Sequence, residues 1–139
     1  RTLLEKELAK AHIEAKFTWD IGATENEMQE ALLLIRQAQW RWDFGVSSHG
    51  GSFHAPQETM RILGHGLNKV FQARMLISKV LVAHGYTDNV PLPDITTKEK
   101  VQQYIGLDMA VEKADKDKFL KEIVPEWLQK AKANGRIVN

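Results

Sequence analysis

"PQETMRILGHGLNKVFQARMLISKVLVAH", residues 56–84, is the stretch that decides the fold. Its apolar side chains recur at steps of three and four residues, which places them on one face of an α-helix. The predicted seam consists of Leu63, Leu67, Val70, Arg74, Ile77 and Leu81, and Phe71, Met75 and Val82 are expected to widen it. Pro56 suits the first helical position, and Gly85 suits a C-terminal cap. The stretch therefore predicts one helix of about 40 Å, at about 1.5 Å per residue.

The residues before this helix predict two more helices. The first is expected from about Leu3 to Asp20. The second should begin after Thr24, which forms a capping-box pattern with Glu27, and end near Gly45. Because the connection between them is short, these two helices should lie antiparallel.

The residues after the long helix predict a loop and further helix. Residues 86–95 are rich in proline, aspartate and asparagine, so they are expected to form an extended loop. Thr96 with Glu99 makes a second capping-box pattern before a short helix. A last helix is expected over residues 108–133, and Pro125 should kink or restart it because the residue before a proline disfavours helical angles. Nothing predicts a strand, so the fold class is all-α: long antiparallel helices in one bundle.

The composition excludes several functional classes. The 139 residues carry a net charge of +1, with lysine and arginine dispersed among aspartate and glutamate, so no nucleic-acid partner is expected. No apolar run reaches the roughly 18 residues that a membrane span needs. The absence of cysteine excludes disulfides, thiolate zinc sites, cysteine nucleophiles and covalent haem attachment by this chain. No nucleophile–base arrangement or phosphate loop is present, so we expect no catalytic residue.

A histidine loop over residues 46–55 is the main candidate site. His49 and His54 lie five positions apart around two glycines, so they cannot form the i, i+4 metal clamp of a helix. Two histidines without a third ligand also make an incomplete zinc site. Two interpretations remain open: the rings hydrogen-bond backbone groups and hold the helix entrance, or one of them ligates a metal or a haem.

His65 is a second candidate, because it stands between two glycines inside a helix. Each glycine costs about 1 kcal/mol relative to alanine there. Gly64 and Gly66 therefore indicate either the close approach of another backbone or a flat ligand, or else a plain helix crossing with His65 facing solvent.

The long apolar stripes raise the question of what covers them. Helices with a persistent stripe in a short chain seldom bury it alone, so part of this surface should pack on another chain or on a missing part of this one. A self-contained four-helix bundle is equally compatible with the periodicity. The chain begins at Arg1 within a helical pattern, and we expect it to be a processed or cut piece of a longer protein.

Three stretches carry a resemblance to a known family. They are "AHIEAKFTWDIGATENEM" (11–28), "AQWRWDFGVSSHGGSFHAPQE" (38–58) and "DITTKEKVQQYIGL" (94–107). In this order and spacing they resemble the C-terminal region of the ammonia-forming cytochrome c nitrite reductase, over the whole chain. That family is periplasmic and multihaem, and it reduces nitrite with six electrons. Its haem c groups attach through CxxCH motifs, one of them a lysine-containing variant, all upstream of the matched region.

The resemblance implies roles for individual residues. His54 matches the family's distal axial ligand to an electron-transfer haem iron, and His49 is left as a second-shell or structural candidate. Nitrite and calcium would bind elsewhere in the parent enzyme. The long helices would form a homodimer, and a membrane-anchored or soluble multihaem protein would donate electrons. Phe53 departs from the methionine expected at its position.

Two other hypotheses compete with the one that this resemblance implies. In the first, the chain is a haem-independent helical interaction or dimerisation module. In the second, it is a stand-alone bundle that binds haem noncovalently through His49 and His54.

Overall fold

The structure, a computed structural model, describes residues 2–137, and these residues form only helices and their connections. The elements are α1 (Thr2–Asp20), α2 (Glu25–Ser47), α3 (Gly51–His54), α4 (Pro56–Ala83), α5 (Lys98–Tyr104), α6 (Met109–Lys118), the π-helical turn η1 (Phe119–Ile123) and α7 (Val124–Ala133). No strand occurs in the described range, so the all-α prediction is confirmed. The helices group into two compact units, one ending at Leu92 and one starting at Pro93. The prediction of a single helical region over residues 1–139 stays a prediction.

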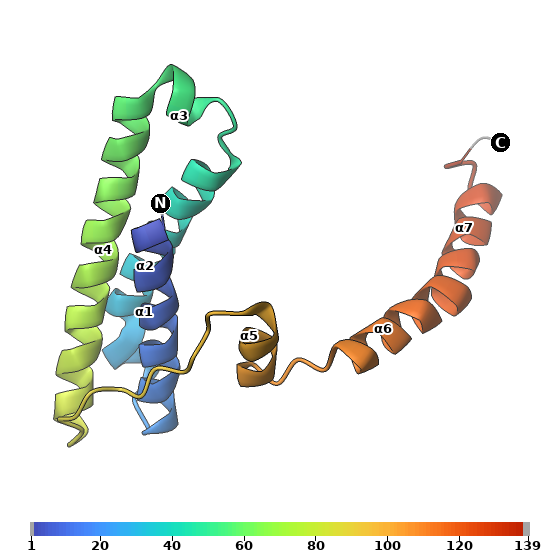
Figure 1. Ribbon diagram of the computed structural model, residues 1–139. Coiled ribbons are helices and arrows are strands. Elements are labelled where there is room, and N and C mark those ends of the chain that lie inside the picture. Colours follow the sequence, from blue (N-terminus) through green and yellow to red (C-terminus); the bar gives the residue numbers. More distant parts are fainter. Residues whose placement is uncertain (1, 138–139) are drawn as a thin grey trace. The chain divides into compact units, whose positions relative to one another are not determined.

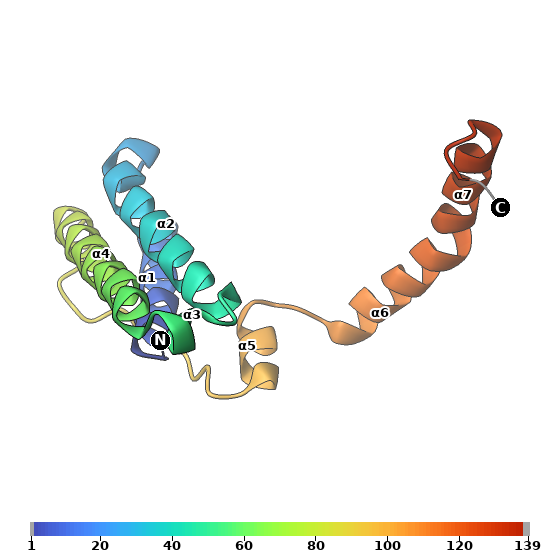
Figure 2. The same ribbon diagram turned by 90° about the horizontal axis from the view of Figure 1, so that it is seen from above.

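The first unit is a bundle of three long helices that run side by side. α1 and α2 are joined by a short turn and lie antiparallel, and α4 then returns antiparallel to α2 (Figure 1 and Figure 2). The contact between α2 and α4 is the most extensive in the chain, and α1 packs on both of them. The antiparallel arrangement predicted from the short connection is therefore confirmed.

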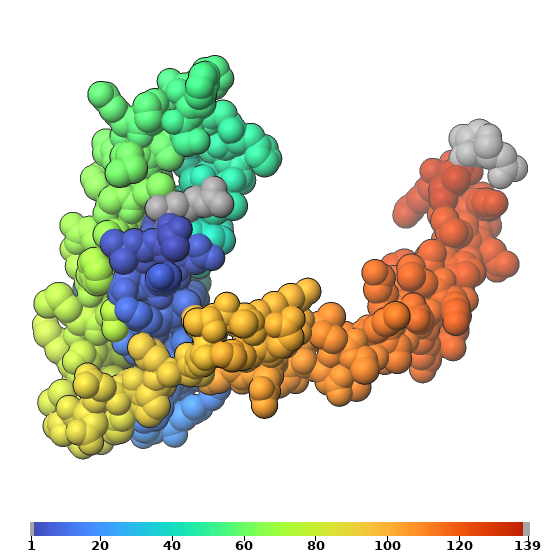
Figure 3. Space-filling view, viewed as in Figure 1, coloured from blue at the N-terminus to red at the C-terminus, as the bar shows by residue number. Residues whose placement is uncertain are grey.

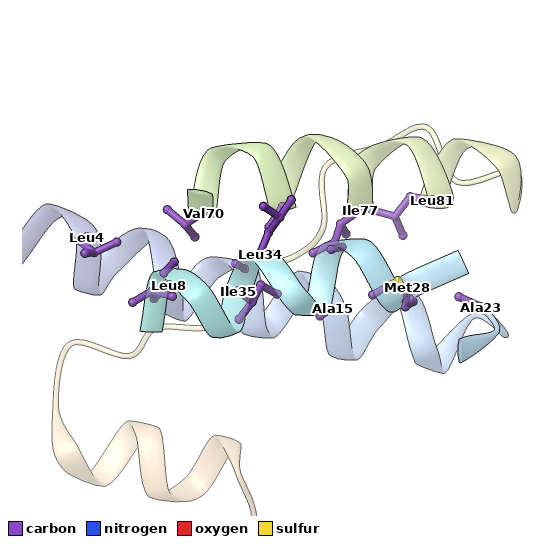
Figure 4. Close-up of a cluster of buried hydrophobic side chains, with 14 of the residues drawn as sticks. Leu4, Leu8, Ala15, Ala23, Met28, Leu34, Ile35, Val70, Ile77 and Leu81 are labelled. Carbon is purple, nitrogen blue, oxygen red and sulfur yellow. The ribbon is translucent and has the colours of Figure 1, made fainter. Parts of the chain in front are cut away.

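Small residues occupy the centre of this bundle. The buried apolar side chains are Leu4, Leu8, Ala11, Ala15, Ala23, Met28, Ala31, Leu34, Ile35, Ala38, Leu63, Val70, Ala73, Ile77 and Leu81 (Figure 4). Gly66 on α4 faces α2 so closely that a Cβ atom there would lie 3.2 Å from the Cβ of Arg41 and 3.5 Å from the carbonyl oxygen of Ala38. Alanine and glycine thus allow the two helix backbones to approach each other.

The predicted seam of the long helix is correct in part. Leu63, Val70, Ile77 and Leu81 are buried as expected, whereas Leu67 and Arg74 are half-buried. The prediction that Phe71, Met75 and Val82 widen the seam is wrong, because these side chains are 43%, 64% and 56% exposed. Thr59, Gly66 and Ala73 are buried in their place. Since the helices meet through small residues, the larger apolar side chains on the neighbouring face have no room in the contact and stay outside.

Arg74 links α4 to α1 through two carboxylates. Its guanidinium donates two hydrogen bonds to Glu14, at 2.8 Å from Nε and 2.6 Å from Nη2, and its Nη1 donates to Glu7. Glu7 also accepts a 2.7 Å bond from Lys10. Burial alone would raise the pKa of Glu7, but the Lys10 bond and the charges of Arg74 and Lys10 together lower it below the ordinary value. The hydrogen bonds to Glu14, followed by the negative charges of Glu14 and Glu7, raise the pKa of Arg74 although burial lowers it.

The capping box at the start of α2 is confirmed. The backbone N–H of Thr24 donates to Glu27 at 2.7 Å, and the Thr24 hydroxyl oxygen accepts from the Glu27 N–H at 3.4 Å. His84, at the end of α4, lies with its Nε2 3.1 Å from the other carboxylate oxygen of Glu27. The side-chain and backbone hydrogen bonds from Thr24, and then the contact with His84, lower the pKa of Glu27 to about 2.

The second unit corrects the predicted start of its first helix. Residues 86–95 before it contain no helix or strand. The N-cap of α5 is Thr97, whose hydroxyl accepts from the Lys100 N–H at 3.4 Å, and not Thr96. Thr96 instead bonds to Asp94 through its N–H at 3.0 Å and its hydroxyl at 2.6 Å. The local aspartate competes for the Thr96 side chain, so the helix begins one residue later.

The predicted restart at Pro125 is confirmed, since α7 begins at Val124 with the proline in its first turn, but the predicted reason is wrong. Val124 keeps helical angles, φ −61° and ψ −43°, and its N–H bonds to the carbonyl of Phe119 five residues back. This π-helical turn interrupts the i to i−4 ladder just ahead of the proline ring, and such turns are a known way for a helix to absorb a local disruption. The helical path therefore continues from α6 into α7.

None of residues 93–137 is buried in the structure. The large apolar side chains left open on η1 and α7 are Phe119, Leu120, Ile123, Trp127 and Leu128. None of the helices within residues 2–137 combines the length and the apolar character that crossing a membrane requires.

The first prediction concerns Arg74. Replacing it with methionine removes the partner of two nearly buried carboxylates, and because Arg74 is partly exposed we expect a loss of about 2 kcal/mol in the free energy of unfolding. Urea denaturation of the wild type and the variant measures this loss. Arg36→Met, on the exposed face of α2, is the matched control and should change stability by less than about 0.5 kcal/mol. Equal effects of the two substitutions would show that the Glu7–Arg74–Glu14 contact contributes nothing.

The second prediction compares two neighbouring glycines of α4. A Cβ atom at Gly64 would meet nothing within 4 Å, whereas one at Gly66 would also press on buried Leu4 at 2.7 Å. Gly64→Ala should stabilise the helix by up to about 1 kcal/mol. Gly66→Ala should be less stable than Gly64→Ala by about 1–3 kcal/mol, because it overpacks the α2–α4 contact. Thermal unfolding of both variants tests this order, and the reverse order would contradict the close approach at Gly66.

The third prediction concerns acid. The pKa of Glu27 is lowered from 4.5 to about 2 in the folded protein, so its contribution to stability is complete above pH 4.5 and is lost as the pH falls towards 2. Glu27→Gln keeps a capping-box side chain but does not titrate. The difference in melting temperature between the wild type and this variant should therefore be positive at pH 6 and shrink between pH 4.5 and 2. A difference in melting temperature that does not change with pH would contradict the lowered pKa of Glu27.

Candidate functional site

The histidine loop lies at the end of the first unit away from the turn between α1 and α2 (Figure 1 and Figure 3). Its backbone is held by hydrogen bonds that form the short helix α3. The N–H groups of Phe53 and His54 donate to the Gly50 carbonyl at 3.1 and 2.9 Å, and the Gly51 N–H donates to Ser48 at 3.1 Å. Four residues of the predicted loop 46–55 are therefore in a helical turn.

Pro56 and Thr59 fix the entrance of α4. Pro56 occupies its first turn, as predicted. The N–H and the hydroxyl of Thr59 both donate to the carbonyl of Ala55 at 3.0 Å. Ala55 is the N-cap residue and supplies no side-chain cap. Within residues 2–137, neither His49 nor His54 makes a ring hydrogen bond at this helix entrance.

The imidazole of His54 is exposed and lies between Gly50 and Phe53. The rings of His54 and Phe53 meet edge to face, with centroids 5.2 Å apart and planes at 89°. A Cβ atom at Gly50 would lie 3.1 Å from Cδ2 and 3.8 Å from Nε2 of the His54 ring. Phe53 is itself 84% exposed. The loop therefore presents a ring nitrogen that has no hydrogen-bond or ion-pair partner among the described residues.

Gly51, the second glycine of the pair, allows close packing within the loop. A Cβ atom at Gly51 would lie 2.5 Å from the Ser48 hydroxyl and 3.3 Å from that of Thr59. The absence of a side chain at Gly51 thus allows the end of α2 and the start of α4 to meet the loop closely.

His49 stays apart from His54. It is exposed, and no hydrogen bond, ion pair or ring contact joins it to His54 in the part of the chain that the structure describes. Nor does any group of three or more histidine, aspartate or glutamate residues within this part lie close enough together to hold a metal ion. Protein side chains alone therefore do not build a metal site here.

His65 lines a separate hollow of about 310 Å³ between α2 and α4, together with Trp40, Arg41, Phe44, Arg61 and Ile62. The close approach expected next to His65 occurs at Gly66, which faces α2, while the position of Gly64 is open. Arg61 is held by Glu58, with its Nε 2.7 Å from a carboxylate oxygen. This hollow was not predicted from the sequence. The i, i+4 spacings of Trp40 with Phe44 and of Arg61 with His65 were the available signals.

Comparisons with known proteins identify the family. The cytochrome c552 family model matches residues 1–135. The chain is 74% identical over 137 residues to a cytochrome c-552 of Bacteroides fragilis, covering 99% of the chain and 28% of that protein. It is 61% identical to the cytochrome c-552 of Porphyromonas gingivalis over 138 residues, covering 99% and 28%. For that of Haemophilus influenzae the identity is 46% over 136 residues, covering 98% and 25%. The chain thus spans about 28% of the length of its Bacteroides relatives.

These matches correct the functional assignment made from sequence resemblance. The family and the relatives carry the name cytochrome c552 or c-552, so the assignment to the C-terminal dimerisation region of an ammonia-forming nitrite reductase is replaced. The alternative of a haem-independent helical module is wrong as well, because a cytochrome c is a haem protein of electron transport. The chain belongs to the cytochrome c552 family.

Proposed function

We propose that this chain is part of an electron-transferring cytochrome in which His54 supplies an axial ligand to a haem iron. The observation that carries the proposal is the ring of His54, which projects from a helix-anchored loop with no hydrogen-bond or ion-pair partner in residues 2–137. When bound, the haem supplies an iron that alternates between the ferric and ferrous states.

The residues of the loop fit such a group. A haem iron with four porphyrin nitrogens and one other axial ligand needs only one more protein atom, so a single histidine suffices. A Cβ atom at Gly50 would lie 3.8 Å from His54 Nε2, and the bare glycine leaves that space free for a flat macrocycle. The exposed ring of Phe53 offers an apolar surface beside it. Since the chain has no cysteine, it cannot form the thioether bonds that attach haem c.

The loop also holds the ligand in a defined place before the haem arrives. Its backbone is bonded at Gly50 and Gly51 on one side and enters α4 at Pro56 on the other. Ligand groups that are already ordered lose less conformational entropy on binding, so this anchoring favours coordination.

The other expectations for the whole protein stay predictions. They are the homodimer through the long helices, the multihaem electron donor and the periplasmic location. The exposed apolar side chains Leu33, Trp40, Met60 and Met75 on α2 and α4, each at least 50% exposed, support the homodimer.

Replacing His54 with alanine in the haem-loaded cytochrome tests the proposed function. One haem should lose an axial nitrogen, so its iron should change from low spin to high spin and the ferrous form should bind carbon monoxide. Added imidazole should restore the low-spin spectrum by filling the open position. Absorption and electron paramagnetic resonance spectra measure both changes.

His12→Ala is the matched control for this test, because His12 is an exposed histidine of α1. His12→Ala and His49→Ala should both keep the wild-type spectrum. If His54→Ala also keeps a fully low-spin spectrum, His54 is not a haem ligand. A high-spin change in His49→Ala with none in His54→Ala would move the ligand to His49.

A further inference from the structure

Gly50 occupies a backbone conformation that does not require glycine. Its φ is −99° and its ψ is −11°, within the region that any L-residue adopts. No residue of the histidine loop has a positive φ. A side chain at Gly50 would thus cause no backbone strain, and the reason for glycine must lie in what its missing Cβ atom would touch.

That contact is the imidazole of His54. A Cβ atom on Gly50 would lie 3.1 Å from His54 Cδ2, which is closer than nine in ten real Cβ contacts, so the ring would have to move by a few tenths of an ångström. The backbone of His54 cannot retreat easily, because its N–H donates to the Gly50 carbonyl at 2.9 Å. The displacement must therefore be taken up by rotation of the ring about its side-chain bonds.

Phe53 bounds the ring on another side. The two rings meet edge to face with their centroids 5.2 Å apart, an arrangement that aromatic pairs prefer. A ring displaced by a side chain at position 50 would have to leave this geometry. The direction in which Nε2 points thus depends on both neighbours.

We infer that Gly50 is a positioning residue, which holds the His54 imidazole in the orientation for haem coordination by leaving room for the ring against its backbone. This inference rests on the proposed role of His54. Residues around a metal ligand fix its ring orientation and thereby tune the metal centre. A substitution at Gly50 should therefore change the iron centre without changing its ligand set.

The experiment introduces Gly50→Ala into the haem-loaded cytochrome and compares it with Gly64→Ala. Both variants add one methyl group to a glycine with negative φ, but at Gly64 the Cβ atom would meet nothing within 4 Å. Electron paramagnetic resonance of the ferric protein and the midpoint potential of the affected haem are the readouts. Gly50→Ala should shift the low-spin g values and the potential of one haem, whereas Gly64→Ala should leave both unchanged.

Gly50→Val extends the series, because its larger side chain should increase the same shifts. Thermal unfolding of each variant shows whether the fold is kept, and Gly50→Ala should melt within about 4 °C of the wild type. If Gly50→Val does not fold, the result with Gly50→Ala decides alone.

The outcomes separate this inference from the proposed function. Wild-type spectra and potential in Gly50→Ala, together with a high-spin change in His54→Ala, would overturn the positioning role and leave the ligand assignment intact. An unchanged spectrum in His54→Ala would overturn both. Equal shifts in Gly50→Ala and Gly64→Ala would also overturn the positioning role, because the effect would not depend on contact with the ring.

Discussion

The close approach of α2 and α4 is the constraint on which the rest of the first unit depends. Gly66 lies against α2, and a Cβ atom added there would lie 3.2 Å from the Cβ of Arg41 and 3.5 Å from the carbonyl oxygen of Ala38. Helices in such contact exclude water from a thin seam, in which even alanine side chains are fully buried. The geometry of this pair then places both ends of the histidine loop, because the loop leaves α2 and enters α4.

The remaining long helix of the bundle, α1, is held by a different kind of contact. α1 adds Leu4, Leu8 and Ala15 to the core, but its partner-specific interaction is the pair of carboxylates that bind Arg74. The guanidinium of Arg74 presents five donors in a fixed fork, and it binds Glu14 through two of its nitrogens and Glu7 through the third. Apolar packing buries one face of α1 in the bundle, and the charge contact joins α1 to α4 at Arg74.

The periodicity of the sequence predicted much of this bundle, because nearby residues determine where a helix ends and which of its faces is apolar. The Thr24–Glu27 capping box and Pro56 marked helix starts that the structure confirms. The large apolar side chains of α4 led to a partly wrong prediction of its buried face. Phe71 and Met75 have strong apolar character but stand on a neighbouring face, whereas buried Ala73 and Gly66 carry little apolar signal. The distance between the two helix backbones determines which residues are buried at such a crossing. A sequence pattern does not contain that distance.

The same distinction applies to the candidate site. His54 was identified from its sequence context, but the tight contact of its ring with Gly50 depends on the helical turn between them, which the two glycines made improbable from propensity alone. The hollow at His65 joins residues about 20 positions apart on two helices and needed the bundle geometry to be seen. In the proposed function the chain contributes one nitrogen atom to a cofactor that it does not itself attach, and the ring's direction is then the property that the fold must supply. The loop runs from the end of α2 to the start of α4, so the packing of these two helices fixes the two points between which the His54 ring is held.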